Sequence, residues 1–206
     1  MSNDQTETDG SSVIVVGGGP AGLSAALFTA KNGLETTVFD TDATWMHKAH
    51  LFNYLGIGSI GGSEFMATAR QQVDQFDVDR RQGVEVTGVE ETGDGFAVET
   101  DDGTEESDYL VLATGANRDL AEDLGCEFDE DGTVAVGLGT ETSIENAYAT
   151  GAMVRPEEWQ AAISVGDGAA AALNILSKER GDHYHDFDVR DDAMDVFSAL
   201  IDEQTE

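Results

Sequence analysis

The feature that most constrains this chain is a glycine-rich turn between an apolar run and a helical pattern. Residues 13–33 read VIVVGGGPAGLSAALFTAKNG. The β-branched run 13–16 predicts a strand buried on both faces, as in a parallel sheet. Apolar residues then recur at helical spacing until Gly33, which is typical of a helix C-terminus. Residues 35–40, ETTVFD, predict a second strand, so these pieces predict a β-α-β unit.

The glycines of this turn form the pattern GxGxxG. Gly17, Gly19 and Gly22 directly follow the predicted strand and directly precede the predicted helix. In that context the first glycine turns the chain, the second lets the backbone approach a pyrophosphate, and the third lets helix and strand pack closely. Pro20 falls in the first helical turn, where a missing N–H costs nothing. A tight turn without a ligand is the alternative, but the context favours a dinucleotide, whose diphosphate would face the free amides.

Asp40 lies at the end of the second predicted strand, 18 residues beyond Gly22. A carboxylate at this position can accept hydrogen bonds from ribose hydroxyls, and it repels a 2′-phosphate. We therefore expect a dinucleotide whose adenosine ribose carries no phosphate.

The rest of the chain predicts an α/β fold, a Rossmann-like parallel sheet with an inserted antiparallel β-meander. We expect strands at VDRRQ (78–82) and GTVAV (132–136), and a strand that leads into a loop at NAYATGAM (146–153). Helices are expected at 63–76, at the start of the segment 117–136 and from Pro156 to Ile175. The meander is expected from VEVTGVEE (84–91), GFAVETDD (95–102) and DYLVLAT (108–114), with hairpin turns between them. We expect residues 1–11 to be a polar, disordered tail, 12–177 one nucleotide-binding domain, and 178–206 an acidic extension with a short amphipathic helix.

The charge of the chain limits its environment and partners. Forty-two acidic residues against ten basic ones give a net charge of -32, spread along the whole sequence. Such a surface indicates a cytoplasm of very high salt, where the Debye length falls to ~3 Å, although an acidic protein of an ordinary cell is the alternative. The absence of a basic stripe argues against nucleic acid and anionic membranes. No apolar run reaches ~18 residues and the N-terminus is no signal peptide, so we expect a cytoplasmic protein.

Other candidate residues carry weaker signals. Cys126 is the only cysteine, which excludes an internal disulfide and a CxxC pair, and we expect a buried, inert thiol in a strand. His183 and His185 alternate without a third ligand, so no metal site is expected. The loop after the second strand holds side chains that either contact a cofactor or lie on the surface, with the surface favoured: Trp45, His47, Lys48 and His50. Met194, Phe197, Leu200 and Ile201 predict an amphipathic helix that docks on this domain or on another chain.

Several blocks in order resemble the thioredoxin-reductase-like flavoproteins of the pyridine nucleotide-disulfide oxidoreductase family. They read VVGGGPAGLSAALFTAKNGLETTVFD, NYLGIGSIGGSEFMATARQQVDQF, GFAVETDDG, YLVLATGA and TSIENAYATGAM followed by WQAAISVGDGAAAAL. The resemblance covers about residues 12–177 and involves the FAD domain of that family. It implies FAD as the cofactor, with NAD(P)H as a transient electron donor.

The resemblance also implies a set of cofactor-binding residues. Gly17, Gly19, Pro20, Ala21 and Gly22 would hold the pyrophosphate, Asp40 the adenosine ribose, and Asn53 would lie along the cofactor. Thr114 and Gly115 would close over it, Gly151 and Ala152 would approach the ribityl and phosphate region, and Gln160 and Ala161 would meet the flavin. The start of the last helix would then stabilise charge on the reduced ring.

The chain departs from that family in three ways. The family's NADPH domain, expected between ATGA and GTVAV, is absent from the sequence, as is the CxxC pair. Ala152 replaces an aspartate that contacts the ribityl chain, a loss of about 1 to 3 kcal/mol. We expect an FAD-dependent oxidoreductase that exchanges electrons with a nicotinamide or a partner protein, and that either docks on a redox partner or forms a homodimer. A non-catalytic FAD- or NAD-binding accessory subunit is the alternative, and an NAD-dependent enzyme is disfavoured. No catalytic residue is assigned.

Overall fold

The chain forms a layered α/β structure. A computed structural model describes residues 10–189, 191–193 and 196. The strands are β1 (Ser12–Val16), β2 (Glu35–Asp40), β3 (His50–Leu51), β4 (Ile60–Gly61), β5 (Asp79–Gln82), β6 (Val86–Glu91), β7 (Phe96–Thr100), β8 (Gly103–Ser107), β9 (Tyr109–Leu112) and β10 (Ala147–Ala149). The α-helices are α1 (Pro20–Lys31), α2 (Gly62–Val73), α3 (Asp119–Asp123) and α4 (Ala161–Arg180), and three 3-10 turns are η1 (Trp45–Lys48), η2 (Asp74–Phe76) and η3 (Gly151–Val154).

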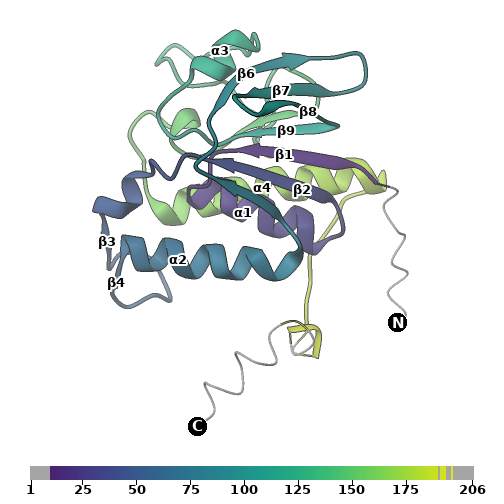
Figure 1. Cartoon of the computed structure of the whole chain (residues 1–206). Coiled ribbons are helices and arrows are strands. Elements are labelled where there is room, and N and C mark those ends of the chain that lie inside the picture. Colours follow the sequence, from purple (N-terminus) through teal and green to yellow (C-terminus); the bar gives the residue numbers. More distant parts are fainter. Residues whose placement is uncertain (1–9, 190, 194–195, 197–206) are drawn as a thin grey trace.

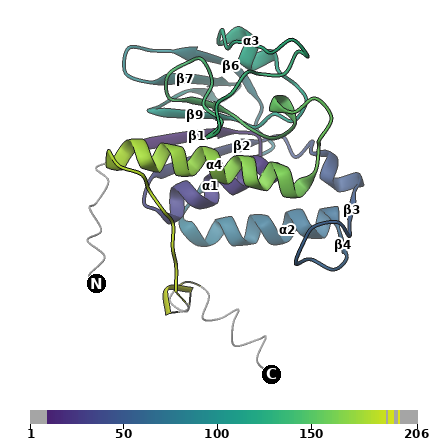
Figure 2. The same cartoon turned by 180° about the vertical axis from the view of Figure 1, so that it is seen from behind.

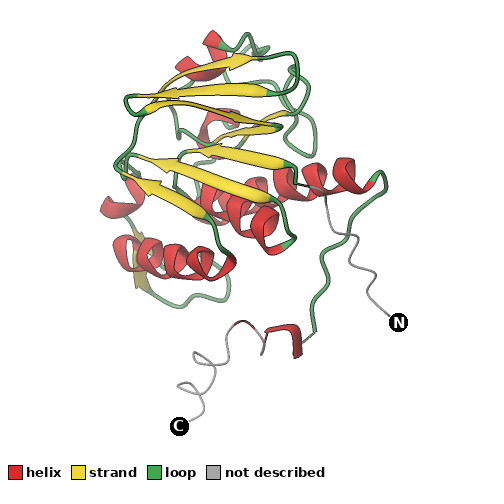
Figure 3. Cartoon of the chain, turned by 45° about the vertical axis from the view of Figure 1, so that its right-hand side comes forward, coloured by secondary structure: helices red, strands yellow, loops and turns green. Residues whose placement is uncertain are grey.

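A parallel sheet in the order β10-β9-β1-β2-β5 organises the molecule. From β1 the chain first builds outward through β2 and β5, then returns to place β9 on the other side of β1. Helices α1, α2 and α4 cover one face, whereas the antiparallel sheet β6-β7-β8 and α3 cover the other (Figures 1 and 2). Figure 3 shows the two sheets as separate layers. The predicted fold class is therefore confirmed.

Alternating side chains of the parallel sheet build two cores. In β1, Val13 and Val15 pack into the cluster that contains α1 and α4 residues, whereas Ile14 and Val16 pack into the cluster with the antiparallel strands. Successive strand residues point to opposite faces, so an all-apolar strand serves both layers at once. This is the physical reason that the run 13–16 contains no polar residue.

The meander differs from the prediction in its third strand. GTEES, residues 103–107, pairs with β7, while residues 109–112 form β9 inside the parallel sheet. β9 is buried at every residue, and β8 is mostly exposed. A charged strand suits the solvated antiparallel edge, and a continuous apolar strand suits the double-sided core. The prediction that DYLVLAT closes the meander was therefore wrong.

The segment 132–136 forms no strand, contrary to the prediction. Its only β-pairing in the described part of the chain is an isolated bridge between Phe128 and Val134. The amide of Val134 donates to Met153 O at 3.0 Å, and that of Ala135 donates to Glu127 O at 2.9 Å. Neighbouring residues thus bond to two different segments, so no ladder with a single partner develops.

The last helix begins five residues later than predicted and also ends later. Its N-cap is Gln160, and it runs to Arg180 instead of Ile175. Before it, the Trp159 indole N–H donates to Arg155 O at 2.9 Å, which holds residues 155–160 in an irregular loop. The prediction that Pro156 and the two acidic residues after it start the helix was therefore wrong.

Two further predictions concern Cys126 and the C-terminal segment. Cys126 is buried as expected, but it lies in the loop after α3 instead of a strand. The proposed stripe of residues 194–201 lies outside the described residues, apart from position 196. Among the helices that the structure describes, none is both long and apolar enough to cross a membrane.

Candidate dinucleotide-binding site

The glycine turn after β1 is shaped by close backbone contacts. Gly17 has a φ of +112°, and a Cβ there would lie 2.3 Å from Ala113 O. A Cβ on Gly22 would lie 1.8 Å from Gly17 O. The Gly17 amide donates to Phe39 O at 2.8 Å, which fixes the turn against β2. Only glycine fits at these two positions, as the first and third glycines of the pattern require.

The middle glycine faces open space. The nearest atom to a Cβ on Gly19 would be Thr44 Oγ1, at 3.7 Å. Gly19 is the N-cap of α1, Pro20 follows in the first turn, and that turn carries no acidic residue. Ala21 is buried behind them. Free amides, the positive end of the helix dipole and unfilled space therefore meet at one point, which fits a diphosphate.

Three strand ends converge beside this turn. Thr114 and Gly115 follow β9, and Gly151 follows β10 after one residue. Gly151 has a φ of +72°, and a Cβ on it would lie 3.1 Å from the Ala21 side chain. The strand order reverses between β1 and β9, so these residues border the topological switch point, where open α/β sheets bind ligands. Ala152 follows in η3, and its carbonyl accepts from Arg118 Nη2 at 3.3 Å.

A second group of predicted residues meets at the start of α4. Asn53 Nδ2 donates to Gln160 Oε1 at 2.9 Å across 107 positions of sequence. Gln160 caps α4, Ala161 is its first residue, and the first turn again carries no acid. Next to this pair the rings of Trp45 and Trp159 lie 5.3 Å apart. The site thus has two acid-free helix starts, those of α1 and α4, in a strongly acidic chain.

Asp40 lies deeper than the sequence suggested. The residue is only 4% exposed, and its Cγ would lie 2.3 Å from a Cβ on Gly18. Its Oδ1 accepts the Asp42 amide at 2.9 Å, and its Oδ2 accepts from Arg70 Nη2 at 3.1 Å. Asp40 therefore forms part of the wall under the glycine turn, with both oxygens already in hydrogen bonds.

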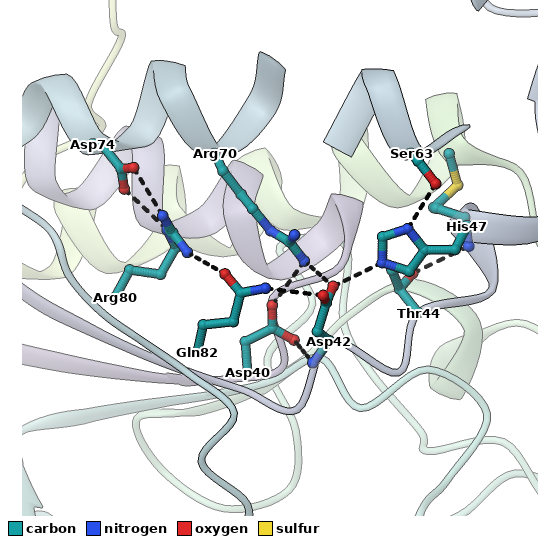
Figure 4. A network of polar contacts seen from close by, with 10 residues as sticks. Asp40, Asp42, Thr44, His47, Ser63, Arg70, Asp74, Arg80 and Gln82 are labelled. Carbon is teal, nitrogen blue, oxygen red and sulfur yellow. Dashed lines mark hydrogen bonds and ion pairs between the residues drawn. The ribbon is translucent and has the colours of Figure 1, made fainter. Parts of the chain in front are cut away.

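Around Asp42, polar side chains from four segments form one network (Figure 4). Asp42 Oδ1 accepts from Arg70 of α2 and lies 2.7 Å from His47 Nε2. Its Oδ2 accepts from Gln82 Nε2 of β5 at 2.9 Å. Two hydrogen bonds lower the pKa of Asp42 to about 2. The larger contribution comes from Arg70 and the next from His47. His47 Nδ1 lies 3.0 Å from Ser63 Oγ, so a neutral ring that donates Nε2–H to Asp42 accepts from Ser63.

The other polar candidates lie outside this crevice. His50 Nε2 lies 2.8 Å from Ser59 Oγ in the β3–β4 hairpin. No metal-binding group of histidine, cysteine, aspartate or glutamate occurs among the residues that the structure describes. Burial raises the pKa of the Cys126 thiol.

A hollow of about 630 Å³ lies at the opposite end of the parallel sheet, at the amino-terminal ends of β1 and β2 and far from the glycine turn. It is bordered by Glu35, Asp79 and Glu105 among others.

Sequence reasoning missed Asp42 and Arg70 as members of the site. Arg70 lies in the last turn of α2, where a basic residue is unremarkable because it complements the helix dipole. One signal was available, since Arg70 is one of only ten basic residues in the chain and lies four positions after Met66 and three before Val73, on the face of the helix that is buried. Trp159 gave no signal, because its approach to Trp45 depends on tertiary structure.

The fold and this crevice define a dinucleotide-binding α/β domain. The sequence profile of the family described as Pyridine nucleotide-disulphide oxidoreductase matches residues 11–59 and 57–166. Because this match covers more than half of the chain, the chain belongs to that family. The comparisons support a flavin oxidoreductase domain, and the family binds dinucleotides.

Individual relatives agree with this membership. A component of the alkyl hydroperoxide reductase of Staphylococcus aureus is 36% identical over 107 residues, which are 50% of this chain and 21% of that protein. The match thus spans about a fifth of the length of such curated relatives. A thioredoxin reductase from Gloeobacter violaceus superposes with a TM-score of 0.77 at 20% identity, covering 86% of this chain and 98% of that chain.

A second solved structure has the same fold. The ferredoxin-flavin thioredoxin reductase from Clostridium acetobutylicum superposes with a TM-score of 0.70 at 17% identity, covering 83% of this chain and 98% of that chain. At these sequence identities the superpositions establish the fold alone. Any inference about function must therefore come from the residues of the site.

Proposed function

We propose that this chain is an FAD-binding oxidoreductase module. The observation that carries the proposal is the pairing of an open glycine turn at the switch point with the Asn53–Gln160 contact at the second helix start. The amides at the start of α1 would hold the diphosphate, with Thr114, Gly115, Gly151 and Ala152 along the ribityl side. FAD, when bound, supplies reversible two-electron redox chemistry.

The residues at the start of α4 would tune that chemistry. Gln160 is kept in place by Asn53, and the amides that follow it have no intrahelical acceptor. The positive end of the α4 dipole then favours negative charge on its ligand. Ala152 offers no side-chain hydrogen bond, so we expect Ala152→Asp to strengthen FAD binding by about tenfold, or about 1.4 kcal/mol.

The visible spectrum of the protein tests this proposal. Protein purified in high salt, or refolded with FAD, should show bound flavin absorption that bleaches on reduction. Calorimetry should give tighter binding for FAD than for NAD. A protein that stays colourless after refolding with FAD in high salt contradicts the proposal, and binding of NAD alone would favour an NAD-dependent enzyme.

We infer that the electron partner is an acidic iron–sulfur carrier protein. Residues 43–63 contain no acidic residue in a chain that has forty-two, and they include Lys48. Beside the site, Phe52 is 77% exposed and Leu55 is 97% exposed. Exposed apolar side chains in a segment without acidic residues suit the docking of an acidic protein, because no like charge opposes it there. The Clostridium acetobutylicum neighbour carries ferredoxin in its name, which supports this class of partner.

Phe52 provides the test of this partner. Phe52→Ser should slow flavin reduction by a reduced acidic ferredoxin, while reduction by dithionite stays unchanged. Phe187→Ser is the matched control, since Phe187 is 74% exposed in the segment after α4. Equal effects of the two substitutions would contradict the docking surface.

A non-catalytic accessory subunit is the second candidate. Ala152 and the burial of the single cysteine, Cys126, favour it, because neither the ribityl contact nor a redox thiol is available. It predicts tight nucleotide binding with no NAD(P)H oxidation by any acceptor. Turnover with a simple dye acceptor would eliminate it.

A further inference from the structure

We propose that Trp45 and Trp159 form an aromatic surface on which the isoalloxazine ring of FAD stacks. This inference rests on the proposed function, because it requires FAD in the crevice. The family resemblance assigns Gln160 and Ala161 to the flavin, but it assigns no role to either tryptophan. These two residues are the only tryptophans of the chain, so no other indole can account for an effect on the flavin.

The starts of α1 and α4 lie side by side at the switch point. A Cβ on Gly151 would lie 3.1 Å from the Ala21 side chain and 3.6 Å from Ser164 Oγ. One turn further along α1, Ser24 Oγ donates to Val165 O of α4 at 2.7 Å. A ligand that extends from the glycine turn past Gly151 therefore reaches the residues that precede α4.

Trp159 occupies that position. It directly precedes Gln160, the N-cap of α4. Its indole N–H donates to Arg155 O at 2.9 Å, and Arg155 Nη2 donates to Asp167 Oδ1 of α4 at 2.6 Å. The ring is therefore held relative to α4 before any ligand binds, which lowers the entropic cost of stacking on it.

Trp45 meets this ring from the side of the glycine turn. The residue before it, Thr44, supplies the atom nearest to a Cβ on Gly19, its Oγ1 at 3.7 Å. The same oxygen accepts from the Met46 amide at 3.3 Å and so caps η1, the turn that carries Trp45. The centroids of the Trp45 and Trp159 rings lie 5.3 Å apart, with 59° between their planes. The ring pair thus joins the two sides of the crevice.

Both rings keep a large exposed area although they contact each other. Trp45 is 60% exposed and Trp159 is 41% exposed, and neither is part of the two cores. Because the rings are tilted and not stacked face to face, each has a face left to cover. A planar three-ring system such as isoalloxazine covers such a surface, excludes water from it and gains from aromatic contact with electron-rich indole. ADP, which lacks this ring, gains nothing there.

Calorimetric titration with FAD and with ADP, at one fixed high salt concentration, tests the inference. The wild-type protein should bind FAD more tightly than ADP. Trp45→Leu and Trp159→Leu should each weaken FAD binding by about tenfold, which corresponds to about 1.4 kcal/mol, and should leave ADP binding unchanged. Phe187→Leu is the matched control, because Phe187 is an exposed ring that stacks on His185 beyond the far end of α4. It should change neither affinity.

The fluorescence of bound flavin gives a second readout that a merely structural role would not move. An indole in contact with an excited flavin quenches its emission by electron transfer, so the wild-type complex should emit weakly. The double variant Trp45→Leu/Trp159→Leu, saturated with FAD, should recover emission, whereas Phe187→Leu should not.

Three results overturn the inference while a nucleotide still binds. They are a wild-type protein that binds FAD no more tightly than ADP, equal effects of the tryptophan substitutions on FAD and ADP affinity, and unchanged flavin emission in the double variant. Equal effects on the two ligands would place the adenine, and not the flavin, against these rings. Failure of the wild-type protein to bind either ADP or FAD overturns the proposed function, and this inference with it.

Discussion

At the scale of single residues, Gly19 and Gly22 have opposite surroundings. A Cβ on Gly22 would lie 1.8 Å from a backbone oxygen, whereas one on Gly19 would have no atom nearer than 3.7 Å. We predict that Gly22→Ala lowers the free energy of unfolding by about 1 to 3 kcal/mol, because backbone must shift. Gly19→Ala should change stability by less than about 1 kcal/mol and weaken FAD binding, because the methyl group occupies the diphosphate space.

Chemical denaturation and FAD titration of the two variants measure this difference. A Gly19→Ala variant that binds FAD as tightly as the wild-type protein would show that the open space is not used by the nucleotide. A Gly22→Ala variant of full stability would contradict the steric role of that glycine.

The pKa of Asp42 gives a pH prediction at the same scale. Because the folded pKa is about 2, below the ordinary value of 3.8, ionised Asp42 stabilises the fold. This contribution is complete above about pH 5, where Asp42 is ionised in both states, and is lost as the pH falls from about 4 through 2. The Asp42 carboxyl resonance, followed by NMR during acid titration, should show this low pKa.

Arg70→Gln is the variant that links this pKa to the network. The hydrogen bond from Arg70 is the first cause of the low pKa, so its removal should raise the Asp42 pKa toward 3.8. The loss of stability on acidification that Asp42 contributes should become smaller, because the folded and unfolded pKa values of this carboxyl then nearly coincide. An Asp42 pKa that is unchanged in Arg70→Gln would show that the ion pair is not formed in solution.

At the scale of elements, the contact between α1 and α4 positions the crevice. A Cβ on Gly168 would lie 2.0 Å from Ala21 O, so α4 approaches α1 directly behind the glycine turn. We predict that Gly168→Ala destabilises the protein by about 1 to 3 kcal/mol and weakens FAD binding, because the two helices must separate.

Gly166 provides the control for this contact. It lies in the same helix with no atom within 4 Å of its Cβ position. Gly166→Ala should therefore stabilise the protein by about 0.5 to 1 kcal/mol through helix propensity alone. Thermal unfolding followed by circular dichroism compares the two variants, and a stabilised Gly168→Ala protein would refute the close packing.

At the scale of the whole molecule, the net charge predicts that stability depends on the salt concentration. The net charge of -32 and the nine basic side chains in the described segments leave most carboxylates without an ion-pair partner. Their mutual repulsion is screened at high ionic strength, where the Debye length is ~3 Å at 1 M salt. We predict that the melting temperature rises steeply with potassium chloride concentration and that low-salt dialysis unfolds the protein or releases its nucleotide. Full stability without salt would contradict adaptation to a saline cytoplasm.

The sequence by itself determined the β-α-β unit, the need for glycine at positions 17 and 22, and the family, because these depend on local steric requirements and on patterns within short segments. Tertiary structure decided which of the two sheets each of two neighbouring strands joined. Residues 109–112 joined the parallel sheet because a strand apolar at every position needs cover on both faces, and residues 103–107 took the exposed edge. It also buried Asp40 and joined Asp42 to Arg70, since the approach of α2 to the end of β2 depends on packing between elements that are distant in the sequence.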